Sequence, residues 1–174
     1  MSRRLERLIR DVPDFPKPGI VFKDITPLLA DPGALAETVD AMIAPFADRD
    51  INVVCGTESR GFIFAAAAAI RLEAGFVPIR KLGKLPWQTI REDYSLEYGS
   101  DGVEIHADAI RPGQRVLMID DLLATGGTMA ACCRLVEKLG GTVAGVSVVI
   151  ELVFLPGREK LAGYDVHSLV RVEG

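Results

Sequence analysis

RVLMIDDLLATGGTM, residues 115–129, brings together a short apolar run, two adjacent carboxylates and a turn of small residues. Residues 116–119 are apolar and follow Pro112 and Gly113, which is typical of a short buried strand. Between Met129 and Leu139 the apolar residues switch to helical spacing. We therefore predict a buried strand, a tight turn and the start of a helix.

The turn in this segment is suited to a phosphate monoester. Residues 125–128 (Thr-Gly-Gly-Thr) can point backbone N–H groups inward, and the following helix adds the positive end of its dipole. Asp120 and Asp121 would repel a phosphate, but they can accept hydrogen bonds from a sugar diol or hold a hydrated divalent cation. Taken singly, each feature also fits a plain connecting turn or a solvated strand end. Together they indicate a phosphorylated ribose, although the segment has neither the lysine of a P-loop nor a G-x-G-x-x-G fingerprint.

Length and composition favour one globular domain, residues 1–174, because a chain of this size can bury roughly two-thirds of its unfolded surface. The net charge of -4 gives no support to nucleic-acid binding. The three cysteines have no metal or redox spacing, and no apolar run is long enough to span a bilayer. We expect no membrane segment, reduced buried cysteines and a cytoplasmic location.

Two further strand-and-turn units precede this segment. A strand at 51–55 leads into the charged turn 56–62, where Arg60 is either an anion ligand or part of a solvated turn. A strand at 76–79 leads into 80–86, which carries three cations beside a glycine. These turns would share the ligand-binding edge of an open sheet. Strands that alternate with helices predict an α/β fold, a mostly parallel twisted sheet flanked by helices.

The remaining segments are predicted less regularly. Residues 1–12 have the spacing of an amphipathic helix that ends at Pro13. Residues 14–27 hold three prolines among apolar side chains, so they either wall a flat ligand or cap the core. Residues 87–102 are polar, contain glycine and lack helical period, which is typical of a long mobile loop. The two histidines, His106 and His167, are expected to be structural.

Residues 119–128 closely resemble the phosphoribosyl-pyrophosphate motif of type I phosphoribosyltransferases, in the form typical of the adenine phosphoribosyltransferases. Residues 15–26 are similar to the base-binding hood of that family, and 58–62 and 80–86 to its pyrophosphate-binding turns. Residues 94–99 resemble its mobile catalytic loop. The resemblance implies a type I phosphoribosyltransferase fold with an N-terminal helix and hood in 1–33 and a flexible lid in 87–102.

The resemblance also implies a role for individual residues. Glu97 is expected to be the acid/base group at the purine imidazole nitrogen. Adenine is expected to stack between Phe22 and Leu122 and to meet backbone groups of Val21 and Lys23. The phosphoribosyl group is expected to contact Asp120, Asp121, Ala124, Thr125, Gly126, Gly127 and Thr128. Pyrophosphate is expected to contact Arg60, Lys81, Lys84 and Arg80, with the Arg80 position able to reach a neighbouring subunit's site.

The activity implied by the resemblance is purine salvage, in which adenine and 5-phospho-α-D-ribose 1-diphosphate give AMP and pyrophosphate. Mg²⁺ would be carried on the substrate diphosphate, so no protein ligand is assigned to the metal. The family is generally dimeric, which implies a homodimer. A 6-oxopurine phosphoribosyltransferase, a purine or phosphoribosyl-pyrophosphate sensor without activity, and a sugar-phosphate module without a base site are the alternatives.

Overall fold

The computed structural model describes residues 3–96 and 99–173. These residues form a seven-stranded sheet in the order β5-β6-β4-β3-β7-β8-β9. Strands β3 (Val53–Thr57), β4 (Gly75–Lys81), β7 (Arg115–Leu123), β8 (Thr142–Leu152) and β9 (Val166–Val172) run parallel to their neighbours in that part of the sheet. The predicted mostly parallel α/β fold is confirmed.

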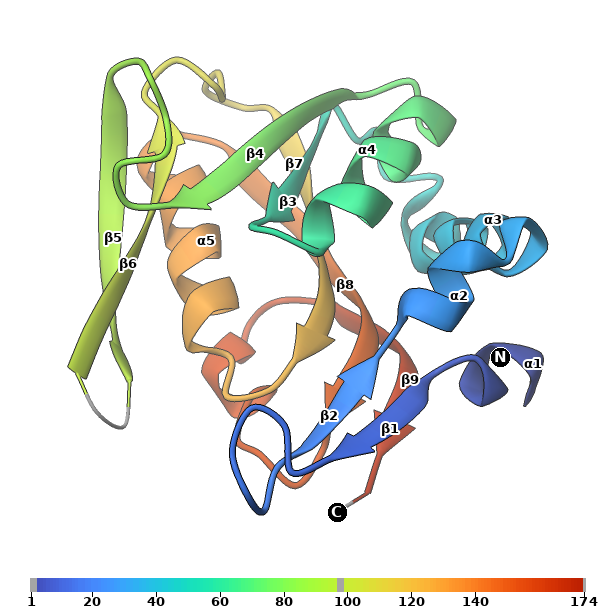
Figure 1. Ribbon diagram of the computed structural model, residues 1–174. Coiled ribbons are helices and arrows are strands. Elements are labelled where there is room, and N and C mark those ends of the chain that lie inside the picture. Colours follow the sequence, from blue (N-terminus) through green and yellow to red (C-terminus); the bar gives the residue numbers. More distant parts are fainter. Residues whose placement is uncertain (1–2, 97–98, 174) are drawn as a thin grey trace.

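Helices cover both faces of the sheet (Figure 1). Helix α5 (Gly127–Lys138) lies on one face, and α3 (Pro32–Ile43) and α4 (Gly61–Arg71) lie on the other. Successive residues of β7 point to opposite faces, so Leu117 packs with the α3 and α4 side and Met118 with the α5 side. The two hydrophobic clusters are therefore separated by the sheet, and they fix where its strands end.

Helix α3 begins at an N-cap residue, because the Asp31 carboxylate accepts a hydrogen bond of 2.8 Å from the Ala34 N–H. A short helix α2 (Thr26–Ala30) precedes it, and the 3₁₀ turn η1 (Ala44–Phe46) follows it. The 3₁₀ turn η2 (Glu159–Leu161) lies between β8 and β9. All three cysteines are buried and free, as expected.

The N-terminal segment differs from the predicted single helix over residues 1–12. Helix α1 spans only Arg3–Arg7, and β1 (Arg10–Pro13) pairs antiparallel with β2 (Val21–Asp24). In a two-stranded ribbon, successive side chains point to opposite faces. Pairing with β2 therefore gives this segment a strand conformation, although its apolar residues have helical spacing. This ribbon, the hood, stands apart from the main sheet beside the end of β9 (Figure 1).

The prediction that residues 87–102 lack regular structure is wrong over most of that range. Strands β5 (Thr89–Leu96) and β6 (Gly99–His106) form an antiparallel hairpin, and β6 pairs with β4. Polar residues dominate because much of the hairpin projects beyond the sheet toward solvent (Figure 1). Residues 97–98, with the catalytic candidate Glu97, lie outside the described residues.

Candidate functional site

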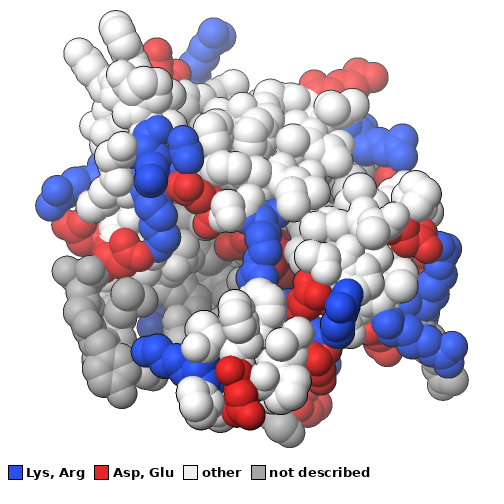
Figure 2. Space-filling model, in the orientation of Figure 1, with Lys and Arg blue, Asp and Glu red and all other residues white. Residues whose placement is uncertain are grey.

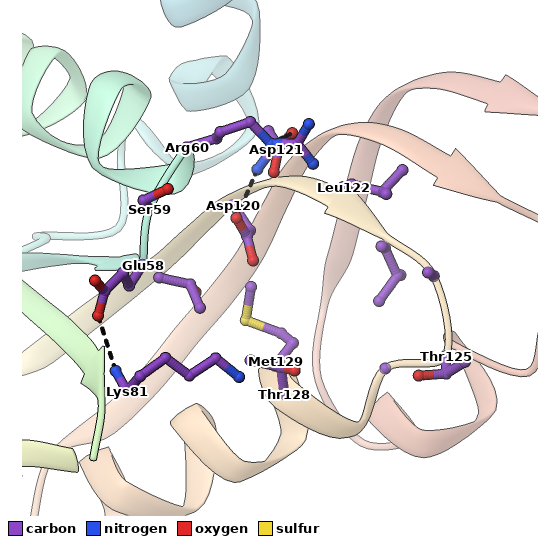
Figure 3. A pocket seen from close by; sticks show the side chains of 14 residues that line it. Glu58, Ser59, Arg60, Lys81, Asp120, Asp121, Leu122, Thr125, Thr128 and Met129 are labelled. Atoms are coloured by element: carbon purple, nitrogen blue, oxygen red, sulfur yellow. Dashed lines mark hydrogen bonds and ion pairs between the residues drawn. The ribbon is translucent and has the colours of Figure 1, made fainter. Parts of the chain in front are cut away.

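A cavity of about 230 Å³ opens where the carboxyl ends of β3, β4 and β7 meet. Thr57, Glu58, Ser59 and Arg60 line one side, and Lys81 reaches across from β4. Most of residues 120–129 form the opposite wall (Figure 3). The three turns that the sequence predicted at one sheet edge therefore surround a single cavity.

The small-residue turn at the base of this cavity, residues 124–128, is the predicted phosphate-binding turn and is named the phosphate loop. Gly126 is the N-cap of α5 and has a φ of 75°, a conformation that a residue with a Cβ rarely adopts. Ala124, Thr125, Gly126 and Thr128 line the cavity, and Gly127 is the first residue of α5. The loop thus directs a helix N-terminus and small polar side chains toward the same space.

Two carboxylates stand beside the phosphate loop. Asp121 is almost fully buried, and its Oδ2 lies 2.8 Å from Nε of Arg60. Burial, together with the negative charge of Asp121, raises the pKa of Asp120 well above its ordinary value. Asp121 is paired with Arg60, and Asp120 accepts a hydrogen bond of 2.9 Å from the Asp121 N–H, so both carboxylates can still accept hydrogen bonds from further donors. A ligand that brings hydroxyl groups, such as a ribose diol, would supply them.

Lys81 is the second cation of the cavity, and its side chain crosses the pocket in Figure 3. Its Nζ donates to the Tyr94 hydroxyl and to the Asp101 carboxylate. Burial disfavours the charged amine, but the hydrogen bonds to Asp101 and Tyr94 outweigh it and raise the pKa of Lys81. The amine therefore stays cationic and can neutralise an anion in the cavity.

Arg80 and Lys84 do not line this cavity. The Arg80 guanidinium lies 3.0 Å from both the Glu58 carboxylate and the Lys84 carbonyl oxygen, and Lys84 itself is exposed. Glu58 also accepts from the Lys81 N–H, and its hydrogen bond from Arg80 lowers its pKa. In a single chain these two predicted pyrophosphate ligands lie on the rim.

A second, larger cavity of about 730 Å³ lies between the hood and the C-terminal strands. Val21, Phe22, Lys23 and Leu122, the four predicted adenine contacts, all line it. Leu122 and Ala124 line both cavities, so the two spaces adjoin. The structure therefore brings the predicted base contacts next to the predicted phosphoribosyl contacts.

The hood presents an aromatic surface to this second cavity. The Phe22 ring packs edge-on against Phe15, with centroids 5.2 Å apart, and the Arg60 guanidinium lies 4.9 Å from the Phe22 centroid. The Lys23 amine is 2.6 Å from Asp11 across the hood. Arg60 thus contacts a carboxylate of the first cavity and an aromatic ring of the second.

Sequence reasoning missed several cavity residues. Ser59 lies beside Arg60 in the charged turn, where its place in the motif was a usable signal. Phe154 and Leu155 line the second cavity from the segment after β8. An exposed phenylalanine next to a strand end is a weak signal, and only the fold brings it opposite the hood.

The face that carries both cavities has mixed charge. Figure 2 shows lysine and arginine side chains interspersed with acidic ones over the residues drawn in colour. The sequence has 20 basic and 24 acidic residues, so any attraction for an anion must come from local geometry. A phosphate loop and two cavity cations provide that geometry.

Comparison with known proteins agrees with this description. The model of the phosphoribosyl transferase domain matches residues 25–168. The adenine phosphoribosyltransferase of Thermobifida fusca is 56% identical over 172 residues, which cover 99% of this chain and 98% of the relative. The chain therefore belongs to the phosphoribosyltransferase family, within its adenine phosphoribosyltransferase branch.

Solved structures show the same relationship. The adenine phosphoribosyltransferase of Rhodothermus marinus is 53% identical and superposes with a TM-score of 0.94, over 97% of each chain. That of Saccharomyces cerevisiae, solved with adenine and an imino-altritol bisphosphate, is 40% identical with a TM-score of 0.91, over 96% of this chain and 97% of that one. The predicted type I phosphoribosyltransferase fold is confirmed.

Proposed function

We propose that the two adjoining cavities transfer the 5-phosphoribosyl group of 5-phospho-α-D-ribose 1-diphosphate to adenine, which gives AMP and pyrophosphate. The observation that carries the proposal is the shared wall at Leu122 and Ala124, which joins an anion-binding cavity to an aromatic-walled one. The nearly full-length similarity to adenine phosphoribosyltransferases supports adenine as the base.

The proposed roles follow the chemistry of each wall. The phosphate loop holds the 5'-phosphate, and Asp120 and Asp121 accept hydrogen bonds from the ribose hydroxyls. Arg60 and Lys81, the cations that line the cavity, neutralise pyrophosphate as it leaves. Arg80 and Lys84 reach pyrophosphate from the rim, or Arg80 serves a neighbouring subunit. Adenine stacks on Phe22 opposite Leu122, with its edge toward the backbone of Val21 and Lys23.

The reaction requires the reactants to be held in line. The N9 lone pair of adenine forms the new bond to C1' while the bond from C1' to the diphosphate oxygen breaks, and its electron pair leaves with pyrophosphate. Adenine reacts with its imidazole proton on N7, which leaves an in-plane lone pair on N9, and the Glu97 carboxylate is proposed to accept the N7 proton as the bond to C1' forms. Because C1' gains oxocarbenium character, fixing the sugar at its phosphate and its hydroxyls lowers the barrier. Glu97 is proposed to hydrogen-bond at purine N7, where a positioned acid/base group typically contributes ~10²–10⁴-fold.

Magnesium fits this site as an ion carried by the substrate. Asp120 and Asp121 offer hard oxygen atoms beside the cavity, but Asp121 is already paired with Arg60. The described residues contain no group of three or more His, Cys, Asp or Glu that could hold a metal ion. Mg²⁺ bound to the diphosphate would neutralise charge that develops on the leaving oxygen. We therefore assign the diphosphate as its main ligand.

A homodimer is also part of the proposal. Ile63, Ile70 and Phe76 are large apolar residues of α4 and β4 with exposed side chains, which is the kind of surface that a second copy would cover. Sedimentation velocity would give the oligomeric state.

No helix in the described part of the chain is long and apolar enough to span a membrane. The cytoplasmic location stays a prediction.

The activity is tested by pyrophosphate release from 5-phospho-α-D-ribose 1-diphosphate and Mg²⁺ with adenine, hypoxanthine, guanine or no base. We expect turnover with adenine, and we expect Glu97→Ala to reduce kcat without a change in thermal stability. Glu6→Ala, at an exposed residue of α1, is the matched control. Turnover with hypoxanthine or guanine in place of adenine would identify the protein as a 6-oxopurine phosphoribosyltransferase. Binding of the substrates without turnover would identify it as a sensor.

A further inference from the structure

The phosphate loop is supported by a segment far from it in sequence. Gly157, between β8 and η2, is packed directly on the loop backbone. A Cβ added at Gly157 would lie 2.2 Å from the Ala124 carbonyl oxygen, and one added at Gly126 would lie 2.5 Å from the Gly157 carbonyl oxygen. No side chain separates the two segments, so the position of Gly157 sets that of the phosphate loop.

The neighbouring residue, Arg158, fixes this segment to the sheet. Its guanidinium makes two parallel contacts with the Glu151 carboxylate, Nε to Oε1 at 2.7 Å and Nη2 to Oε2 at 2.6 Å. Its Nη1 donates to the Val166 carbonyl oxygen at 3.0 Å, and the Ser168 hydroxyl donates to Glu151 at 2.6 Å. A planar fork held at three oxygen atoms leaves Arg158 little freedom.

Glu151 attaches Arg158 to the central sheet. It lies near the end of β8, where the parallel register aligns it with Leu123, the residue immediately before the phosphate loop. Its side chain is 4% exposed. The hydrogen bond from Arg158, assisted by Ser168, lowers the pKa of Glu151 to about 2, so the pair stays ionised at neutral pH.

Stability alone is a poor explanation of such a pair. Apolar residues of similar volume that replace a buried ion pair often give a fold of the same stability. A bidentate contact does, however, define direction and distance, which is what a loop that must match a phosphate requires.

We infer that Glu151 and Arg158 are positioning residues for the phosphate loop. The pair holds Gly157 against Ala124 and Gly126, so that the loop keeps the geometry that receives the 5'-phosphate of the substrate. The inference rests on the proposed function. It concerns only the ribose-phosphate end of the site, because pyrophosphate is assigned to Arg60 and Lys81 on the opposite wall.

The test compares ligands that occupy different ends of the site. Calorimetric affinities for ribose 5-phosphate and for inorganic pyrophosphate with Mg²⁺ would be measured for the wild type and for Arg158→Met. We expect a loss of roughly 10- to 100-fold in affinity for ribose 5-phosphate, since the loss of one hydrogen bond to a charged group costs about that factor. Pyrophosphate affinity should change less than twofold. Arg158→Lys, which keeps the charge without the planar fork, should lie between the two proteins.

Matched variants separate positioning from folding. Arg71→Met removes an exposed pair with Asp40 at 3.2 Å and should leave both affinities unchanged. Glu151→Gln combined with Arg158→Met avoids a buried uncompensated carboxylate, so this variant tests the inference if Arg158→Met alone fails to fold. It should show the same selective loss, with the melting temperature recorded for each variant.

The possible outcomes are distinct. Selective loss of ribose 5-phosphate affinity by folded variants supports the inference. Unchanged affinities, or equal losses for both ligands, would overturn it. A wild-type protein that neither binds ribose 5-phosphate nor turns over 5-phospho-α-D-ribose 1-diphosphate would instead refute the proposed function.

Discussion

Replacement of Gly126 by alanine tests whether the close approach of two backbones shapes the phosphate loop. Alanine at a φ of 75° costs roughly 1–2 kcal/mol in backbone strain alone. The new Cβ would also lie 2.5 Å from the Gly157 carbonyl oxygen, whereas such carbon–oxygen contacts are normally about 3.3 Å. The loop and residue 157 must therefore separate by close to 1 Å, which we expect to lower kcat/KM for 5-phospho-α-D-ribose 1-diphosphate by up to ~10²-fold.

Gly113→Ala is the matched control for this substitution. Gly113 has a φ of 84°, and a Cβ added there would meet no atom within 4 Å. Both variants therefore share the backbone strain, and only Gly126→Ala adds the steric contact. Steady-state kinetics and thermal unfolding would be measured for both. Equal activity of the two variants would refute the claim that contact with Gly157 shapes the loop.

Three other predictions concern the adenine site, the loop of residues 80–86 (the cationic loop) and the stability of the fold at low pH. Phe22→Ala should raise KM for adenine by roughly 5- to 150-fold, because loss of aromatic stacking on a base costs about 1–3 kcal/mol. KM for 5-phospho-α-D-ribose 1-diphosphate should stay near the wild-type value. The reverse pattern would contradict the assignment of Phe22 to the adenine site. Glu104 accepts hydrogen bonds from the Lys84 and Leu85 N–H groups and from the Thr89 hydroxyl. Glu104→Ala should weaken pyrophosphate binding by roughly 10-fold, because each unsatisfied donor costs about 1–3 kcal/mol. Glu104→Gln keeps acceptors and should retain binding. Equal losses of calorimetric affinity for the two variants would argue that Glu104 does not position this loop. The Glu151 pKa is lowered from 4.5 to about 2, so ionised Glu151 contributes roughly 3 kcal/mol to the free energy of unfolding above pH 4.5, and this contribution is lost as the pH falls toward 2. The free energy of unfolding of Glu151→Gln should therefore not fall with pH over this range. A dependence on pH equal to that of the wild type would contradict this prediction.

The sequence predicted those parts of the molecule whose signal is local. Residues 116–119 carry the strand, and residues 125–128 carry the turn, because both depend on neighbours within one strand-turn-helix unit. Helical spacing misled at Arg10–Pro13, since pairing with β2 is decided by residues that follow a proline-rich turn. Polarity misled at residues 89–96, where Arg91 and Asp93 are exposed but Tyr94 is buried in the core on the α5 side.

The candidate site divides in the same way. Motif residues such as Arg60 and Lys81 were predicted to meet, and the sheet order brings them into one cavity. The groups that hold the motifs were not predicted. Glu104 is separated from Lys84 by 20 residues, and Gly157 packs on a loop more than thirty residues away in sequence. No periodicity links such partners, so only the folded chain identifies them.

These supporting groups explain how a chain with four more acidic than basic residues can present a site for a polyanionic substrate. Glu58 and Glu104 do not face a phosphate with free charge, because each accepts hydrogen bonds from the backbone of the cationic loop. Glu151 likewise faces Arg158, behind the phosphate loop. Glu104 and Glu151 therefore lie behind the loops, whereas Glu58 lines the cavity but is held by Arg80 and the Lys81 N–H. The cavity presents two carboxylates beside its cations and the phosphate loop, and net charge says little about what it binds.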